Sequence, residues 1–199
     1  MITEIHPGIY YVGVNDRTTT RFESLWSLPQ GVSYNAYLVV GEKVALIDTV
    51  EEAFAGRLEA NIREIIADRK IDYLMVNHME PDHSSSIAAL RRIYPEMRIV
   101  GNAKALQMIA GFYGIDGGMV EAKENDTLDL GGLTLTFQMI PMVHWPETMV
   151  TWCPERRTLF SGDAFGTFGA LDGGIVDSQI DPERYWDEMR RYYACIVGK

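Results

Sequence analysis

The stretch from Ile71 to Ile93 constrains the fold most, because a strand pattern leads through a polar turn into a helix pattern. The apolar run IDYLMVN at 71–77 is typical of a buried strand. SSSIAALRRIY at 84–94 then offers hydroxyl side chains as helix caps before apolar residues at helical spacing. RIVG and NAKALQMIAGFYG, at 98–114, repeat the strand-then-helix order. This repetition predicts successive β-α units.

Strand patterns flank these units on both sides. IYYVGV predicts a strand, and SYNAYLVV with KVALIDT predicts a hairpin that ends at Asp48. FAGRLEANIREIIADR carries apolar residues at helical spacing. Beyond residue 118, DTLDL, LTLTFQMI, TMVTWCP and RTLFSGD predict strands, and a last helix is expected from Asp181. The order predicts an α/β domain with two sheets between helices.

The composition excludes several classes of function. With 199 residues, 47% apolar and 23% charged, the chain suits an ordinary globular domain. Its formal charge of −10 argues against a nucleic-acid or anionic-membrane partner, which would need a basic face. No run approaches the ~18 apolar residues of a membrane span, and the N-terminus lacks a signal-peptide pattern. Two separate cysteines, Cys153 and Cys195, argue against a disulfide framework and indicate a reducing cytoplasm.

Metal-type side chains crowd the turn after the first buried strand. His78, Glu80 and Asp82 alternate there, and His83 follows directly. Pro81 disfavours a helix through them, and in an extended chain residues i, i+2 and i+4 point to one side. A single Asp or His at this place would more often be a cap or an exposed turn residue. Four in six residues at a strand end instead predict an α/β active site.

Two later strand ends carry further side chains of this kind. His144 follows an apolar strand in IPMVHWPETM, and Asp163 follows another in TLFSGDAFG. Each alone is a weak signal, since His144 could be a core histidine and Asp163 a turn residue beside Gly162. Their recurrence at three strand ends is what points to a metal site.

The pattern H-x-E-x-D-H, then a lone His, then the Asp of SGDAFG, resembles the metallo-β-lactamase superfamily. Hydrolases of that superfamily usually carry H-x-H-x-D-H and bind zinc, whereas Glu80 stands here in place of the second histidine. Together with SYNAYLV and HWPETM, this substitution resembles the diiron domain of flavodiiron proteins (A-type flavoproteins). The resemblance spans nearly the whole chain and implies a metallo-β-lactamase-like αββα sandwich over residues 1–199.

The resemblance also implies a ligand set for two iron ions. One iron would be held by His78, Glu80 and His144, the other by Asp82 and His83, and Asp163 would bridge both. Imidazoles and carboxylates around open positions suit iron that binds and reduces a diatomic ligand. A bridging carboxylate can hold two metals at the ~3.5–4 Å separation of two-metal sites.

The chain departs from the family in two respects. Family members add one more histidine to the second iron from a later segment, whereas no histidine follows His144 here. No Gly- and Ser/Thr-rich phosphate loop follows Asp163, so the flavodoxin-like domain that holds FMN has no counterpart. Because a sandwich without its last strands would expose unpaired edges, we expect an excised domain, truncated before those strands, rather than a short natural relative.

Three functions remain open at this point. The resemblance implies an oxidoreductase that reduces dioxygen to water or nitric oxide to nitrous oxide, with FMN supplied from outside this chain. It further implies rubredoxin or a flavin reductase as electron donor and a homodimer of the full-length protein. The second function is a zinc- or iron-dependent hydrolase that uses a metal-bound hydroxide. The third is a metal-free scaffold, against which the six intact ligands argue.

Aromatic residues supply the remaining candidates. Trp145 and Trp26 are candidates to face a flavin from a partner protomer, with core packing as the alternative for each. On the final helix, Tyr192 falls on the core-facing stripe and Tyr193 lies about one hundred degrees away. A phenol there could donate a hydrogen bond to a bound oxygen intermediate, and Tyr193 is our candidate. Ordinary packing is again the alternative.

Overall fold

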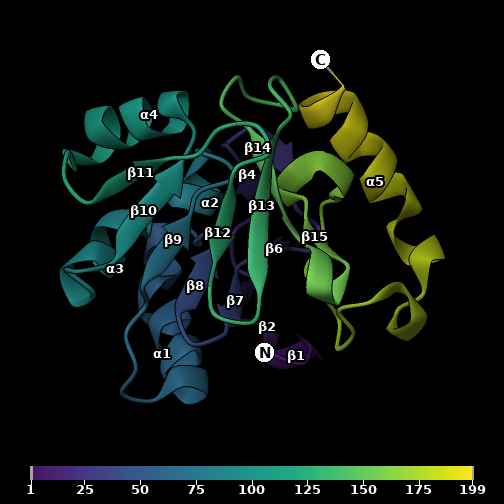
Figure 1. The fold of residues 1–199 in the computed structure, drawn as a ribbon. Coiled ribbons are helices and arrows are strands. Elements are labelled where there is room, and N and C mark those ends of the chain that lie inside the picture. The colour runs from purple at the N-terminus through teal and green to yellow at the C-terminus, as the bar shows by residue number, and fades with distance from the viewer. Residues whose placement is uncertain (1, 199) are drawn as a thin grey trace.

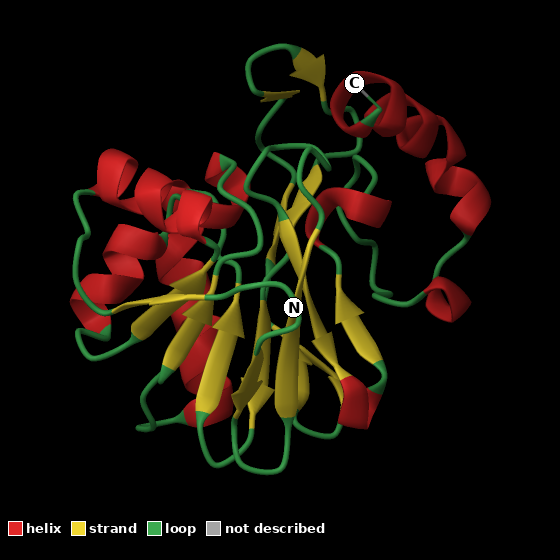
Figure 2. Cartoon of the chain, turned by 45° about the horizontal axis from the view of Figure 1, so that its top comes forward, coloured by secondary structure: helices red, strands yellow, loops and turns green. Residues whose placement is uncertain are grey.

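Two β-sheets lie against each other, with helices at both sides of the sandwich (Figure 1). The computed structural model describes residues 2–198. Helices α1, α3 and α4 cover one side, and α5 lies on the other, beside β15. Figure 2 shows loops and short helices gathered at one end of the strands. The candidate ligands come from loops that follow or precede strands of both sheets.

The larger sheet has seven strands in the order β1-β2-β7-β8-β9-β10-β11. From β1 to β8 the neighbours pair antiparallel, and from β8 to β11 they pair parallel. The parallel part contains the predicted β-α units. The bounds are β1 Thr3–His6, β2 Ile9–Tyr11, β7 Tyr37–Val40, β8 Val44–Ile47, β9 Tyr73–Met75, β10 Arg98–Gly101 and β11 Met119–Glu121.

The smaller sheet is antiparallel, in the order β12-β13-β14-β15. Its strands are β12 Thr127–Asp129, β13 Thr134–Met139, β14 Met149–Cys153 and β15 Thr158–Phe160. Two short pairs lie outside both sheets, β3 Val14–Asp16 with β6 Val32–Tyr34, and β4 Arg21–Phe22 with β5 Trp26–Ser27.

The α-helices are α1 Ala55–Ile66, α2 Pro81–Ser84, α3 Ile87–Ile93, α4 Ala103–Tyr113 and α5 Trp186–Tyr192. Short 3₁₀ segments are η1 Glu52–Phe54, η2 Pro154–Arg156, η3 Gly162–Phe165, η4 Asp177–Gln179 and η5 Pro182–Tyr185, and η6 Tyr193–Val197 is π-helical. Within residues 2–198, no helix has the length and apolar character needed to cross a membrane.

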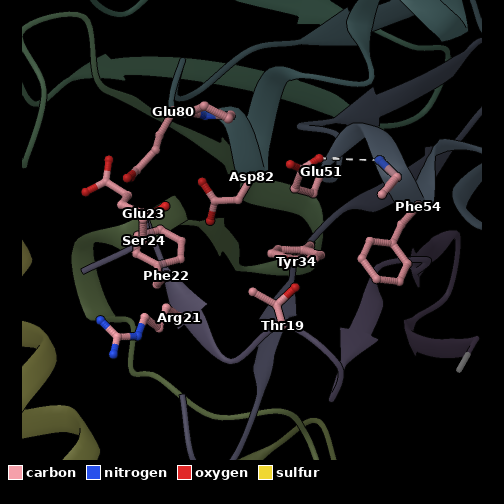
Figure 3. Close-up of a pocket in the computed structure, with 12 residues that line it drawn as sticks. Thr19, Arg21, Phe22, Glu23, Ser24, Tyr34, Glu51, Phe54, Glu80 and Asp82 are labelled. Carbon is pink, nitrogen blue, oxygen red and sulfur yellow. Dashed lines mark hydrogen bonds between the residues drawn. The ribbon is translucent and has the colours of Figure 1, made fainter. Parts of the chain in front are cut away.

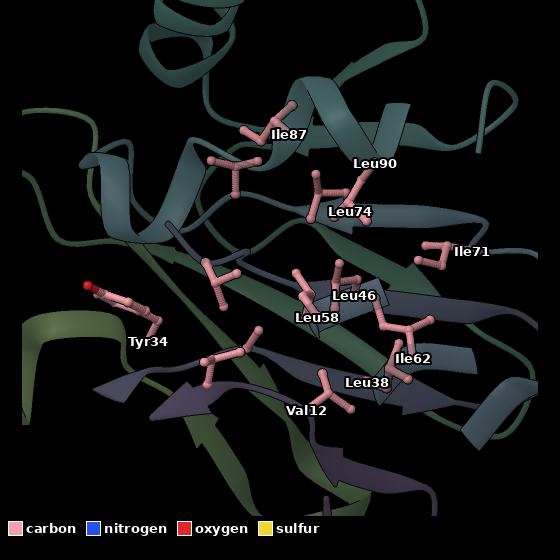
Figure 4. Packing of buried hydrophobic residues seen from close by; sticks show 14 of the residues in the cluster. Val12, Tyr34, Leu38, Leu46, Leu58, Ile62, Ile71, Leu74, Ile87 and Leu90 are labelled. Atoms are coloured by element: carbon pink, nitrogen blue, oxygen red, sulfur yellow. The ribbon is translucent and has the colours of Figure 1, made fainter. Parts of the chain in front are cut away.

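The larger sheet is buried on both faces, which explains its continuous apolar runs. Leu46 of β8 packs toward the helices, in one cluster with Leu58 of α1 and Leu90 of α3 (Figure 4). Its neighbour Ile47 points the other way, into a second cluster that includes Phe137 of β13. The strand ends are therefore held between two packed cores, so side chains placed there are fixed in position.

The predicted elements are present, with three local differences. IYYVGV does not form one strand but divides into β2 and β3 at Gly13, where a Cβ would lie 2.3 Å from the carbonyl oxygen of Tyr34. The extended conformation expected through Asp82 is wrong, because the chain enters α2 with Pro81 in its first turn, where proline is tolerated. The expected serine cap of α3 is also wrong: Ser86 precedes the helix, but its hydroxyl donates to the carbonyl of Val50.

Candidate metal centre

A buried asparagine joins the three strand ends that carry the candidate ligands. Asn77 follows β9, and its carbonyl accepts a hydrogen bond from Met149 N at the start of β14, at 2.9 Å. Its side chain donates to the carbonyl of Phe160 at the end of β15 and accepts from Thr151 Oγ1 at 2.7 Å. Because Asn77 is fully buried, these bonds are shielded from water. They hold the segments of His78, His144 and Asp163 together.

Three of the predicted ligands lie together: His78, Glu80 and His144. We call them the first half of the centre. His144 Nε2 lies 2.9 Å from Glu80 Oε2 and 3.3 Å from His78 Nε2. Asp163 Oδ2 lies 3.2 Å from His144 Nε2 and 3.6 Å from His78 Nε2. One ligand atom from each of these four residues lies within 4.8 Å of the others.

These separations fit a metal ion. An ion about 2.1 Å from each nitrogen or oxygen separates neighbouring donors by roughly 3 to 3.5 Å. Four donors converge with that spacing, three of them fully or almost fully buried. Glu80 Oε1 is buried without a hydrogen-bond partner within residues 2–198, so it remains available as an additional donor.

The second half of the centre, Asp82 and His83, lies on α2. Asp163 Oδ1 is 2.9 Å from His83 Nε2, and Asp82 Oδ2 is 3.6 Å from the same nitrogen. Asp82 Oδ1 is buried and has no hydrogen-bond partner in the described part of the chain. The two oxygens of Asp163 therefore face different halves, which is the arrangement that a bridging carboxylate requires.

A buried carboxylate stands behind one histidine of each half. Glu147 Oε1 is 3.0 Å from His78 Nδ1 and accepts the Met79 amide at 2.9 Å. Asp48 Oδ2 is 3.5 Å from His83 Nδ1, and its Oδ1 accepts the Asn77 amide at 2.7 Å. Such partners orient a metal-ligating imidazole and fix which nitrogen faces the metal.

The sequence interpretation did not assign these two carboxylates, although a signal existed for each. Asp48 ends a predicted strand, as Asp163 does, and Glu147 directly precedes one, close to His144. The same rule of acidic residues at strand ends would have found both. Asn77 had no such signal, because a lone asparagine after a strand is common.

The pKa values show how strongly the side chains of the first half interact. Burial disfavours the charged form of His78, but its hydrogen bonds to Glu147 and Glu80 outweigh this and raise its pKa to about 9. Burial likewise opposes the charging of His144, whose bonds to Asp163 and Glu80 raise its pKa to about 9. The pKa of Glu80 falls to about 2, because bonds from His144 and His78 exceed the effect of burial. In the absence of a metal, the protonated imidazoles of His78 and His144, paired with carboxylates, thus stabilise this half.

In the second half, burial has the largest effect on the pKa of Asp82. Burial raises the pKa of Asp82 to about 7, and the negative charges of Asp163 and Glu80 contribute to the rise. The pKa of His83 is raised well above its usual value although burial opposes this, since Asp82 and Asp163 are close. The pKa of Asp163 is well below its usual range, because the charge of His83 and the bonds from His144 and His83 overcome burial.

The two tyrosines of the final helix differ in what they touch. Tyr193 is partly exposed, and its hydroxyl donates to the carbonyl of Ala164 at 2.6 Å, not to a candidate ligand. Tyr192 is buried and lines a cavity of about 190 Å³ together with Asp82, His83 and Asp163. Its pKa is raised first by burial, then by the charges of Asp163 and Asp82 and a hydrogen bond to Asp163. The phenol beside the centre is therefore that of Tyr192.

The two tryptophans also lie in different surroundings. Trp145 is half-buried and meets the rings of His78 and His144 edge-on, with centroids 5.3 and 6.2 Å apart. Trp26, in β5, packs against the core cluster on the helix side of the larger sheet. Trp145 alone of the pair contacts candidate ligands.

Two sheets between helices, with imidazoles and carboxylates converging at the strand ends, define a metallo-β-lactamase-like domain with a candidate metal site. Comparison with known proteins agrees with this class. The family model described as "ODP family beta lactamase" matches residues 32–197, so the chain belongs to that family.

Relatives of known sequence and structure are flavodiiron proteins. A nitric oxide reductase of Moorella thermoacetica is 37% identical over 195 residues, which cover 97% of this chain and 49% of that protein. The rubredoxin-oxygen oxidoreductase of Megalodesulfovibrio gigas is 37% identical over 197 residues, covering 98% and 49%. The crystal structure of the flavodiiron protein from Giardia intestinalis matches with a TM-score of 0.93 and 30% identity, covering 100% of this chain and 48% of that chain.

The expected resemblance to the diiron domain of flavodiiron proteins is thus confirmed, and so is the metallo-β-lactamase-like fold. The chain spans about half the length of the curated relatives it matches.

Proposed function

We propose that this chain is the diiron domain of an oxidoreductase that reduces dioxygen to water, nitric oxide to nitrous oxide, or both. The observation that carries the proposal is the carboxylate Glu80 placed 2.9 Å from His144 and 3.3 Å from His78, where zinc hydrolases of the superfamily carry a histidine. An oxygen donor at this place favours iron over zinc. The names of the relatives, nitric oxide reductase and rubredoxin-oxygen oxidoreductase, support the same reaction class.

Two irons are assigned to the two halves of the centre, with Asp163 shared. The donor set fits, since it supplies imidazole and carboxylate atoms at metal-like spacing and two buried oxygens without partners, on Glu80 and Asp82. When bound, two ferrous ions supply two electrons together to a diatomic substrate. Around them, Glu147 orients the imidazole of His78 at 3.0 Å. The Asp48 carboxylate lies 3.5 Å from His83 Nδ1, which has no hydrogen-bond partner among the described residues.

Tyr192 is the residue of this chain best placed to donate a hydrogen bond to a substrate oxygen. It is buried and shares a cavity with Asp82, His83 and Asp163. Tyr193, our candidate from the sequence, acts in this proposal through Ala164, because its hydroxyl donates to that carbonyl beside Asp163. A direct role of Tyr193 stays a prediction.

The electron supply belongs to parts outside this chain. We propose FMN on another domain or protomer, a homodimer of the full-length protein, and rubredoxin or a flavin reductase as donor. The name of the Megalodesulfovibrio gigas relative supports a rubredoxin-type donor. Trp145, half-buried against His78 and His144, is the side chain we assign to face the flavin.

Two further proposals follow from the sequence. Residues 1–199 are taken as one diiron domain, consistent with the two contiguous core clusters. A cytoplasmic setting is proposed because both cysteines are free thiols, one buried and one half-buried.

The test is to compare wild type with Glu80→His after anaerobic loading with iron and zinc together. Wild type should retain iron and consume nitric oxide or dioxygen when reduced FMN is supplied. The variant should shift its metal content toward zinc and lose reductase turnover, because a third imidazole makes the site resemble that of the hydrolases. If the variant kept its iron and full turnover, Glu80 would not decide the chemistry. If wild type took up zinc and hydrolysed ester substrates instead, the hydrolase function would hold.

A further inference from the structure

A cavity beside the centre is much larger than the proposed substrates need. It measures about 350 Å³ and lies between the β4–β5 hairpin and α2, with Glu80 and Asp82 in its wall (Figure 3). A diatomic molecule takes about the space of one water, roughly 30 Å³. Substrate size therefore does not account for this cavity.

The lining of the cavity is mixed: apolar groups, including those of Phe22, Phe54 and Pro81, make up the larger part of it, and polar groups are available to hold water. Its polar members come from the hairpin region, from β6 and from the segment before η1: Thr19, Arg21, Glu23, Ser24, Tyr34 and Glu51. Ordered water needs room and two to four polar partners, and this lining offers both. A hydrated cavity in contact with Glu80 and Asp82 can bring protons to the centre, and reduction of dioxygen or nitric oxide consumes protons.

Few of the lining groups can carry a proton inward. Arg21 stays protonated throughout the physiological range. Tyr34 donates its hydroxyl to Asp16 Oδ2 at 3.1 Å, and burial first, then the charge of Asp16, raises its pKa. Glu80 and Asp82 are assigned to metal. Glu23 also lines the cavity, but it is exposed on the β4–β5 hairpin and so is already in contact with bulk solvent (Figure 3).

Glu51 is the half-buried carboxylate of the lining that is not assigned to metal. Its Oε2 makes two long contacts of 3.4 Å, with Ala53 N and with Ser85 Oγ. Ser85 in turn donates to the carbonyl of Pro81 at 2.6 Å, at the start of α2. Glu51 is thus held beside the helix of Asp82 and His83, and its weak contacts leave the carboxylate able to turn toward water.

We propose that this cavity is a hydrated vestibule and that Glu51 passes protons from solvent through its water to the substrate at the centre. An acid in solution protonates the Glu51 carboxylate, the proton moves along cavity water to the reduced oxygen, and Glu51 returns to its anionic form. The electrons come from the FMN named above, so this inference rests on the proposed function. Glu51 is a proton-relay residue here and not a metal ligand.

The test uses iron-loaded protein with reduced FMN and compares Glu51→Gln with Glu52→Gln. The neighbouring Glu52 is a matched control, because it is exposed and does not line the cavity. Glu51→Gln should lower kcat about tenfold, below the 10²–10⁴ of direct acid catalysis, and increase the solvent isotope effect. KM and iron content should be unchanged, Glu51→Asp should recover part of the rate, and Glu52→Gln should behave as wild type.

A second measurement separates this inference from the proposed function. Water-to-protein NMR contacts at the half-buried lining residues Thr19 and Phe54 should show a hydrated cavity, with or without turnover. A dry cavity overturns the vestibule even if the enzyme is active. Wild-type turnover of neither gas overturns the proposed function and the relay with it, whatever the hydration. An active wild type with an unchanged rate and isotope effect in Glu51→Gln, or an equal loss in Glu52→Gln, overturns the relay alone.

Discussion

The two halves of the candidate metal centre are built in different ways. The first half brings together His78 and His144, 66 residues apart in the chain, with their Nε2 atoms 3.3 Å apart. The second half uses two neighbours, Asp82 and His83, on the single turn of α2. Among the described residues, one donor atom from each member of the first half and from Asp163 lies within 4.8 Å of the others, whereas Asp82 and His83 are not part of that group.

The first half is organised before a metal binds to a greater extent than the second. Bonds of Asn77 to the start of β14 and to the end of β15 fix the first half, and Glu147 holds His78 at 3.0 Å. The second half depends on a local turn and on a longer contact, 3.5 Å, from Asp48 to His83. Because organising ligands costs free energy when a metal binds, we expect the first half to bind metal more tightly.

The largest effect is expected from Asp163→Ala, which removes the residue that both halves share. The substitution removes the contacts of Asp163 at 2.9 Å to His83 and at 3.2 Å to His144. Iron affinity should fall in both halves by more than about 100-fold, which is the largest loss typical of substituting a residue that only supports a metal ligand. Metal analysis after anaerobic loading measures it, with the exposed Asp116→Ala as control. Retention of one full iron would show that the halves are independent.

The next effect separates the halves directly. His83→Ala should leave about one iron per chain, since the three residues of the first half and the shared Asp163 stay intact. His78→Ala removes a fully buried imidazole of the first half, and the variant should lose the iron that binds more tightly. Stepwise titration with ferrous iron, followed by absorption and metal analysis, measures both. If His78→Ala kept the tighter site, the proposed order of affinity would be reversed.

A smaller effect on iron affinity is expected from substituting Glu147 or Asp48, the carboxylates that lie beside His78 and His83. Glu147→Gln should weaken the first half about tenfold, at the low end of the 10–100-fold range for such partners. Asp48→Asn should change the second half less, because its contact to His83 is longer than that of Glu147 to His78. Glu124→Gln is the control, since Glu124 Oε2 also accepts a backbone amide, of Met139 at 2.7 Å, but is exposed. Equal losses in all three variants would indicate a general effect on folding.

The smallest effect concerns metal-free protein and pH. The pKa values of His78 and His144 are raised to about 9, so their stabilisation is complete below about 6.5 and is lost as pH rises through 9. The pKa of Asp82 is raised to about 7, so the cost of ionising it in the second half grows between about pH 4 and 7. The midpoint of thermal unfolding should fall by a few °C between pH 6.5 and 9.

Two histidine variants locate this pH effect in the first half. His144→Gln should flatten the decline above pH 6.5, whereas His6→Gln should not, because His6 is exposed and lies in β1, away from the centre. A midpoint that is constant from pH 6.5 to 9 in wild-type protein would contradict the expected stabilisation by protonated histidines.

The sequence identified the ligand-bearing strand ends because both signals are local. An apolar run such as IDYLMVN marks a buried strand, and the residue types that follow it mark the chemistry. The family resemblance assigned His78 and Glu80 to the same iron, and the structure brings His78 Nε2 within 3.3 Å of Glu80 Oε2. Reasoning from spacing misjudged Asp82, because proline in the first turn permits a helix that the alternation of residue types does not reveal.

The β-α units, the strands around them and the six metal-type side chains could be predicted from the sequence, because periodicity and residue chemistry are properties of short segments. Only the tertiary structure decided that the oxygens of Asp163 face different halves and that Glu147 stands behind His78. It also decided that Tyr192, not Tyr193, lines the cavity beside Asp163. These relations join residues 19 (163 − 144) to 80 positions apart and depend on how two sheets pack. Contacts between distant segments leave no local pattern in a single sequence.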